Sequence, residues 1–326
     1  MRALVTGGQG FVGSHLCARL VAQGCRVRVL ARPASELRNL DGIDVEVVRG
    51  DVTQPAGLPS ALAGCDVIFH VAGALKGLRE QDLFRVNADG TRNLVAAAVR
   101  ATPRPRRFVY VSSIAAAGPS PGGAAPRTEE MQAHPLTWYG RSKLAGEDAV
   151  RSTQGLDWTI VRPPIVFGPR ERDVLGYFRI ARHGLLPVVG FSDRYYSLIY
   201  AADLADGLVR AAEAGTAAGQ VYFLAGAQAV SWIELGQLIA AALGVKGRPL
   251  RLPEPVALVA GRIADLYALV RGRPEIFSSQ KVIEMLAPAW VCSPDKAARD
   301  FGWRAPTPLS AALSATARWY REHGWL

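Results

Sequence analysis

The chain has 326 residues, of which 49% are hydrophobic and 20% charged, and its formal net charge at pH 7 is +10. This length can hold one large core and a smaller lobe, and the composition is ordinary for a globular protein. The basic residues are scattered rather than grouped and no apolar run reaches membrane-spanning length, so we expect neither a nucleic-acid partner nor an integral membrane segment.

Four cysteines, Cys17, Cys25, Cys65 and Cys292, are too far apart for a Cys-x-x-Cys pair and have no histidine at metal-ligand spacing. We therefore expect free thiols in a reducing compartment and no metal site. The first strand pattern begins at once, without a signal peptide before it. Together these features predict a cytoplasmic protein.

The first predicted element is a strand that enters a glycine turn and a helix, RALVTGGQGFVG. Gly7, Gly10 and Gly13 are spaced three apart, in the order that a dinucleotide-binding βαβ unit requires. Gly7 permits the tight turn, Gly10 lets the backbone approach a pyrophosphate, and Gly13 lets the helix pack close on the strand. The helix N-terminus, with Phe11 and Val12, would offer N–H groups and a positive dipole end to the phosphates.

Strand and helix patterns alternate through the rest of the first half. Continuous β-branched runs separated by helices indicate a parallel sheet buried on both faces, so the predicted fold class is α/β, a doubly wound Rossmann sheet. The further strands are expected over 26–32, 45–48, 67–71, 108–113 and 158–162, and the helices over 87–100 and 139–152.

The stretch Ala115–Pro126, AAAGPSPGGAAP, follows the fifth predicted strand. Its composition predicts a long flexible loop. Ligands bind at the carboxyl ends of parallel strands in open α/β sheets. We therefore expect this loop to act as an active-site lid.

Beyond Gly168 the pattern is less regular, with helices expected over 174–183, 232–243, 256–270 and 309–325, a strand running into a helix over 197–212, and a strand over 220–224. The helix over 256–270 is mostly apolar. Three interpretations of it stay open: core packing, the apolar wall of a lipid pocket, or contact with a membrane surface.

Arg32 stands at the end of the second predicted strand, where the fold faces the adenosine ribose. An arginine can hold a 2′-phosphate with two parallel hydrogen bonds, so Arg32 predicts NADP(H), with NAD(H) possible; the alternative is a solvated arginine. Asp51, with Val52 beside it, closes the third strand and is placed to accept from the adenine amino group.

Val71, Ala72 and Gly73 end the fourth predicted strand. Small residues at this point would let the dinucleotide lie against the backbone. We therefore include all three among the predicted cofactor-binding residues.

Tyr139 and Lys143 form a Tyr-x-x-x-Lys motif at the start of the helix after the loop. Residues i and i+4 share a helix face, and an ammonium near a phenol lowers the pKa of the phenol. Tyr139 is thus the candidate acid/base at a carbonyl or alcohol carbon, with Lys143 also reaching the nicotinamide ribose. Ser113 is the preferred hydroxyl to orient the substrate oxygen, and Ser112 is the near alternative.

These motifs together resemble the extended short-chain dehydrogenase/reductase superfamily. The resemblance is carried by TGGQGFVG, the Ser113/Tyr139/Lys143 set, Asn87 before Asp-Gly-Thr, and RPPIVFGP. It implies a Rossmann domain, a smaller C-terminal substrate lobe, contacts of Pro163 and Val166 with the nicotinamide, and a homodimer. The implied division is 1–168 with 197–226 for the dinucleotide, and 169–196 with 227–326 for the substrate.

Within the superfamily, Ile114-Ala115-Ala116 replaces the acids of sugar-nucleotide dehydratases, and Tyr196 stands where epimerases usually place an arginine, with Arg194 as a possible substitute. The segments 255–274 and 303–326 look more like the 3β-hydroxysteroid dehydrogenase and dihydroflavonol-reductase branches. The resemblance implies an NADP(H)-dependent oxidoreductase for a secondary alcohol or ketone on a hydrophobic small molecule.

Two other functions are alternatives for a chain with these motifs. A nucleotide-sugar epimerase with tightly bound NAD would use the same Tyr139 and hydride shuttle. A non-catalytic dinucleotide sensor would have no need for a proton donor, so the intact Ser/Tyr/Lys set argues against it.

Overall fold

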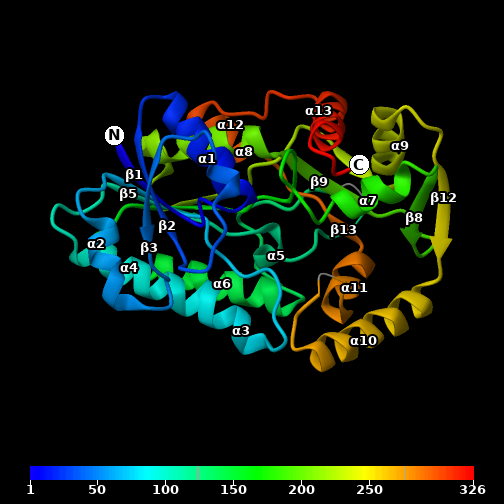
Figure 1. The fold of residues 1–326 in the computed structure, drawn as a ribbon, viewed down its shortest axis with the longest axis horizontal. Helices are drawn as coiled ribbons and strands as arrows, with labels where there is room; N and C mark the ends of the chain where they lie inside the picture. Colours follow the sequence, from blue (N-terminus) through cyan, green and yellow to red (C-terminus); the bar gives the residue numbers. More distant parts are fainter. Residues whose placement is uncertain (123–124, 276) are drawn as a thin grey trace.

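A computed structural model of the chain describes residues 1–122, 125–275 and 277–326 (Figure 1). Its largest sheet has seven strands in the order β10-β6-β5-β4-β1-β2-β3, and every neighbouring pair is parallel. The strands are β1 (Arg2–Thr6), β2 (Arg26–Ala31), β3 (Val45–Arg49), β4 (Val67–His70), β5 (Arg107–Val111), β6 (Trp158–Val161) and β10 (Gln220–Tyr222). This confirms the predicted Rossmann fold. The strand order reverses between β1 and β4, which is where such sheets bind their ligand.

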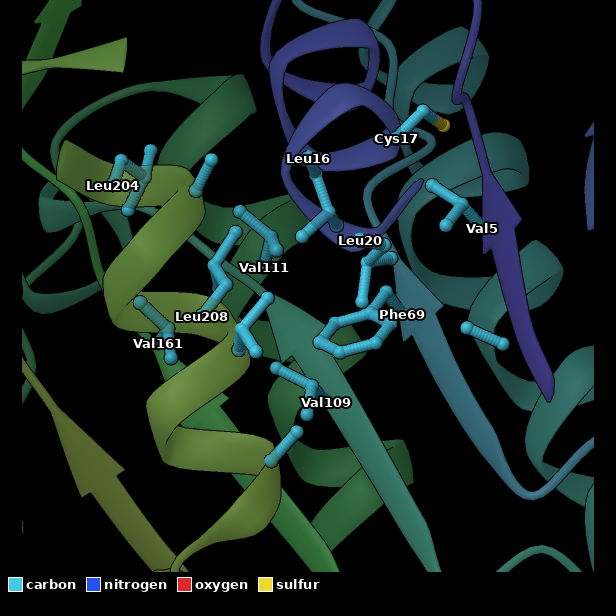
Figure 2. Close-up of a cluster of buried hydrophobic side chains, with 14 of the residues drawn as sticks. Val5, Leu16, Cys17, Leu20, Phe69, Val109, Val111, Val161, Leu204 and Leu208 are labelled. Carbon is cyan, nitrogen blue, oxygen red and sulfur yellow. The ribbon is translucent and has the colours of Figure 1, made fainter. Parts of the chain in front are cut away.

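Helices cover both faces of this sheet. On one face α1 (Phe11–Ala22) lies beside α8 (Ala201–Glu213), and the side chains of Val5, Phe69 and Leu208 meet between the helices and the strands (Figure 2). On the other face lie α2 (Leu58–Leu62), α4 (Gly90–Arg100) and α6 (Trp138–Arg151), over a cluster that contains Leu4. Successive strand residues point to opposite faces, so the continuous apolar runs fill two cores.

The second half of the chain builds smaller sheets. The strand β9 (Tyr195–Tyr200) pairs with β7 (Ile165–Phe167), β11 (Ala229–Ser231) and β13 (Ala289–Trp290), and β8 (Leu185–Val189) pairs with β12 (Arg248–Leu252). The helices here are α7 (Leu175–Ala181), α9 (Trp232–Leu243), α10 (Glu254–Arg271), α11 (Ser279–Leu286), α12 (Asp295–Phe301) and α13 (Leu309–Glu322). A third apolar cluster, which includes Phe178, Ile239 and Tyr320, joins several of them.

The helix predicted over 87–100 is broken near its start. A short helix α3 (Glu80–Phe84) leads into one π-helical turn, Arg85–Asp89, and α4 begins only at Gly90. The π-helical turn is the first structural sign of a functional position, because such turns recur at binding and catalytic sites.

The prediction of a long flexible loop over 115–126 is wrong for its first part. Ser113 caps a short buried helix, α5 (Ile114–Ala117), and further on the N–H of Ser120 donates to the carbonyl of Ala289 at 3.0 Å. Of the described residues of this stretch, Ala115 lines a cavity that also contains Ser113 and Tyr139. The role of the stretch as an active-site lid stays a prediction. Residues 123–124 lie outside the described residues.

Candidate active site

The glycine turn between β1 and α1 has a geometry that only glycine satisfies. Gly7 has a φ of +70°, and a Cβ there would lie 2.8 Å from the backbone N and Cα of Ala72. A Cβ on Gly13 would collide with the carbonyl oxygen of Gly7, while the N–H of Gly10 donates to that same oxygen at 3.0 Å. The turn is therefore pressed against both the end of β4 and the first turn of α1.

The N-terminus of α1 is open to an anion. Among the described residues, no side chain caps this helix and no acidic residue stands in its first turn, where Phe11 and Val12 are half-buried. The free N–H groups and the dipole of such a terminus favour a phosphate. The turn and the helix start thus fit the pyrophosphate of a dinucleotide.

The end of β2 carries the residue expected to select the cofactor. Arg32 follows β2 directly and is exposed, and its carbonyl accepts a hydrogen bond from Nη1 of Arg49 at 3.0 Å. Arg38 pairs instead with Glu36 at 2.6 Å. Arg49 therefore places its guanidinium beside the backbone of Arg32, at the strand end where a ribose phosphate would lie.

Asp51 and Val52 follow the end of β3. One carboxylate oxygen of Asp51 already accepts the N–H of Thr53 at 2.8 Å, so a single oxygen remains for an adenine amino group. Val52 is buried, and its carbonyl accepts a hydrogen bond from Asn93 at 3.1 Å. Val52 therefore packs within the core, and a contact with adenine stays a prediction.

Val71, Ala72 and Gly73 lie just beyond β4. The N–H of Ala72 donates to the hydroxyl of Thr6 at 3.2 Å, and Gly73 is exposed. A Cβ on Gly73 would lie 3.7 Å from Nζ of Lys143. The structure thus brings the end of β4 next to the predicted catalytic lysine.

Asn87 holds this segment from within the π-helical turn. Its side-chain amide donates to the carbonyl of Ala74 at 2.9 Å and to the hydroxyl of Ser142 at 2.9 Å, and its Oδ1 accepts from the N–H of Ala74 at 2.8 Å. Sequence reasoning used Asn87 only as part of a resemblance. Its role as a bridge between β4 and α6 appears only in the structure.

Lys143 is buried below the cleft. Its ammonium donates to the carbonyl of Val111 at 2.7 Å and lies 4.3 Å from the ring centroid of Tyr110. Burial lowers the pKa of Lys143 to about 7, and the negative charge of Glu147 partly opposes this shift. The charge of Lys143 near neutral pH therefore depends on its buried surroundings.

Glu147 connects the candidate site to the buried Arg162, a contact that the sequence patterns did not predict. Its carboxylate accepts from the hydroxyl of Ser112 at 2.6 Å, from the guanidinium of Arg162 at 2.7 and 2.8 Å, and from Arg151 at 2.8 Å. Glu147 follows Lys143 by four residues on α6, so the i, i+4 spacing was the available signal.

The environment of Tyr139 corrects one expectation. Burial raises the pKa of Tyr139 to about 12, and a side-chain hydrogen bond with Ser113 only partly lowers it. The predicted lowering by the neighbouring ammonium is wrong for this structure, because Lys143 directs its charge to the carbonyl of Val111 instead. The phenol is protonated at neutral pH and is suited to donate a proton.

The two candidate serines have different surroundings. The hydroxyl of Ser112 is buried and donates to Glu147, whereas Ser113 lines the same cavity as Tyr139 and caps α5 by accepting the N–H of Ala115 at 3.1 Å. Ser113 is thus the serine that shares the cleft with the phenol.

The two residues expected near the nicotinamide follow β6. Pro163 accepts the N–H of Ile114 at 2.9 Å through its carbonyl, and Val166 sits in β7 opposite Ile199. The intervening Pro164 and Ile165 line the cavity. Both predicted residues therefore flank the cavity wall without lining it.

A cavity of about 470 Å³ extends from Ser113 and Tyr139 into the C-terminal half. Its walls are largely aromatic and aliphatic, and they include Trp138, Val188, Trp232, Phe277, Met285 and Trp290. Trp138 begins α6, and the other five come from separate parts of the irregular second half, where sequence patterns give little indication of which side chains meet.

Two charged groups of the cavity wall are already engaged. Arg194, the possible substitute for a diphosphate-binding arginine, donates to the carbonyl of Val189 at 2.6 Å and to Glu254 at 2.5 Å. Glu284 accepts the hydroxyl of Thr137 at 3.2 Å, and its charge raises the pKa of Tyr139. Lys281 also pairs with Glu284, at 3.1 Å. The cavity thus presents a mostly apolar volume bordered by charged residues, which also include Lys76, Asp173, Asp193, Asp265 and Glu275.

The fold and this cleft define a class: an enzyme that binds a dinucleotide on a Rossmann sheet, an NAD(P)-dependent oxidoreductase. Residues 3–225 match the family model described as the NAD dependent epimerase/dehydratase family. The chain belongs to this family, within the extended short-chain dehydrogenase/reductase superfamily, as its motifs predicted.

The chain is similar to known proteins over nearly its whole length. It is 34% identical over 323 residues to the ceramide reductase of Caulobacter vibrioides, covering 99% of this chain and 95% of that protein. The crystal structure of gox2253 is 28% identical, with a TM-score of 0.83 and 99% coverage of both chains. The dTDP-glucose 4,6-dehydratase DesIV of Streptomyces venezuelae, solved with NAD bound, is 25% identical, with a TM-score of 0.80 over 100% of this chain and 98% of that chain.

Proposed function

We propose that this protein is an NADP(H)-dependent reductase that interconverts a ketone and a secondary alcohol on a lipophilic small molecule. The observation that carries the proposal is the apolar cavity of about 470 Å³ that ends at Ser113 and Tyr139. The similarity to a reductase named for ceramide supports a lipid-like substrate.

The proposed division of the chain follows the cavity walls. Residues 1–168 and 197–226 would hold the dinucleotide, and 169–196 and 227–326 would shape the substrate site. Support comes from Val188, Trp232 and Met285, which line the cavity far from the glycine turn in the sequence. A homodimer stays a prediction from the resemblance.

In this proposal the polar groups of the cleft have different roles in catalysis and in cofactor binding. Tyr139 donates the proton from its hydroxyl to the ketone oxygen, and Ser113 donates a hydrogen bond that orients the same oxygen. Lys143 holds the cofactor ribose and a positive charge beneath the cleft. The bound nicotinamide supplies the hydride. Gly7, Gly10 and the start of α1 hold the pyrophosphate, and Arg32 holds the 2′-phosphate.

The test is NADPH oxidation, followed at 340 nm, with a panel of a 3-ketosteroid, a flavonoid ketone, a long-chain N-acyl amino ketone and UDP-glucose. We expect turnover of at least one apolar ketone, and a loss of about 10²–10⁴-fold in kcat for Tyr139→Phe with an unchanged NADPH Kd. The control Tyr267→Phe alters an exposed phenol on α10 and keeps full activity.

Two results would contradict the proposal. Equal activity of Tyr139→Phe and the wild type would remove the assigned acid. Purification with tightly held NAD, together with epimerisation of UDP-glucose and no ketone turnover, would favour the nucleotide-sugar epimerase instead.

A further inference from the structure

The helix α10 packs through its smallest residues. Ala257, Gly261 and Ala268 are the buried positions, and a Cβ on Gly261 would lie 3.0 Å from the side chain of Val282 on α11. Asp265 secures the same side by accepting the N–H of Ser279 at 3.1 Å. The face toward the protein is therefore formed by alanine and glycine.

The large apolar side chains of α10 point the other way. Eight of them are between 40% and 81% exposed: Val256, Leu258, Val259, Ile263, Leu266, Tyr267, Leu269 and Val270. In Figure 1, α10 lies along the outer edge of the molecule, beyond α11. We call these eight residues the α10 apolar face. Contiguous apolar surface of this kind marks a contact site.

The exposed charges around the α10 apolar face are mainly positive. Among the described residues between 255 and 277, Arg262, Arg271 and Arg273 are exposed, and Glu275 is the exposed acid. The two acids of α10 are engaged, Glu254 by Arg194 at 2.5 Å and Asp265 by Ser279. An apolar face bordered by arginines has the character of a helix that lies in the headgroup region of an anionic membrane.

The face is continuous with the cavity. Leu269 and Phe277 are both exposed and both line the cavity, and Ala268 lines it from the inner side of the helix. The α10 apolar face thus meets the apolar wall of the cavity at the cavity rim, which is formed by Leu269 and Phe277.

We propose that the α10 apolar face docks on the surface of a bilayer rich in anionic lipid, with the rim of the cavity facing the lipid. A second copy of the chain fits less well, because the exposed charges beside this face are mainly arginines, which a two-fold interface would bring close to the arginines of the other copy. The proposal goes beyond the reductase assignment and does not depend on it.

The test is co-sedimentation of the full chain with two kinds of vesicle, phosphatidylcholine alone and phosphatidylcholine with 30% phosphatidylglycerol. We expect the partition coefficient to be at least tenfold higher for the anionic vesicles and to fall with added salt. Ile263→Glu/Val270→Glu and, separately, Arg262→Glu/Arg271→Glu reduce it at least tenfold. Circular dichroism checks that the variants are folded.

Two control variants make substitutions of the same kind at exposed positions outside α10. Ile180→Glu adds an acid at an exposed isoleucine of α7, and Arg26→Glu/Arg100→Glu makes the same charge change on two exposed arginines. We expect Ile180→Glu to bind like the wild type and the arginine control to lose less than half of the effect. The proposal is overturned by equal binding to both vesicles, by no binding to either, by equal loss in the controls, or by an Ile263→Glu/Val270→Glu variant that changes only the oligomeric state.

Discussion

Two apolar helices of this molecule, α1 and α10, have opposite surroundings. The shorter helix, α1 with 12 residues, packs on the sheet beside α8 and buries Leu16 and Leu20 completely. The longer, α10 with 18 residues, packs on α11 and leaves Ile263 63% and Val270 81% exposed. An apolar sequence thus gives a helix a face that can pack on other apolar groups. The elements that the fold places beside the helix decide whether this face is buried inside the protein.

The largest expected effect is at the carboxylate of Glu147 on α6. Glu147→Gln leaves the buried Arg162 without its counter-charge, so we expect the free energy of unfolding to fall by about 3–5 kcal/mol. Urea denaturation measures it. Asp148→Asn, at an exposed neighbour on α6, is the control and should change it by less than about 0.5 kcal/mol.

The same variant has a pH signature. The charge of Glu147 raises the pKa of Lys143, which burial holds at about 7. Its removal lowers the pKa of Lys143 further, so the lysine loses its proton at a lower pH. We expect the alkaline limb of the kcat profile to move to lower pH, and an unmoved limb would show that Lys143 does not depend on Glu147.

Paired leucine substitutions compare the two helix environments directly. Leu208→Ala removes a fully buried side chain between α8 and the sheet, and we expect a loss of about 2–5 kcal/mol in the free energy of unfolding. Leu266→Ala removes a side chain on α10 that is 64% exposed, and the loss should stay below about 0.5 kcal/mol. Similar losses at both positions would mean that α10 is covered in the isolated protein.

Alanine substitutions at two glycines with the same backbone conformation distinguish the cost of left-handed strain from the cost of a close contact. Gly7 and Gly24 have φ of +70° and +73°, but a Cβ meets the backbone of Ala72 only at Gly7. Both alanine variants bear the left-handed strain of about 1 kcal/mol. Gly7→Ala should lose about 1–3 kcal/mol more in thermal unfolding, and only it should weaken dinucleotide binding. Equal losses would contradict the close approach.

The smallest effect is expected at the cofactor-selecting end. Arg32→Ala should weaken NADPH about 10–100-fold in a fluorescence titration and leave NADH unchanged, because only the 2′-phosphate is lost as a partner. Arg26→Ala, at the other end of β2, is the matched control. Tighter binding of NADH than NADPH to the wild type would remove the assignment to NADP(H).

One further observation concerns α10 and its length. Among the described residues, no helix combines the length and the hydropathy needed to cross a bilayer. The proposed lipid contact is a surface contact, in which α10 lies along the bilayer with Arg262 and Arg271 beside its apolar face.

The sequence by itself determined the glycine turn, the alternation of strands and helices, and the Tyr139–Lys143 spacing, because each depends on residues close together in the chain. Only the tertiary structure decided that Lys143 points to Val111, that the phenol keeps its proton, and that Glu284 and Trp290 reach the same cavity. It also argued against core packing for the helix near 256–270, whose largest side chains lie outside the core. The burial of a side chain and its pKa depend on contacts between segments that are distant in the sequence. A local sequence pattern does not show which distant segments will come together.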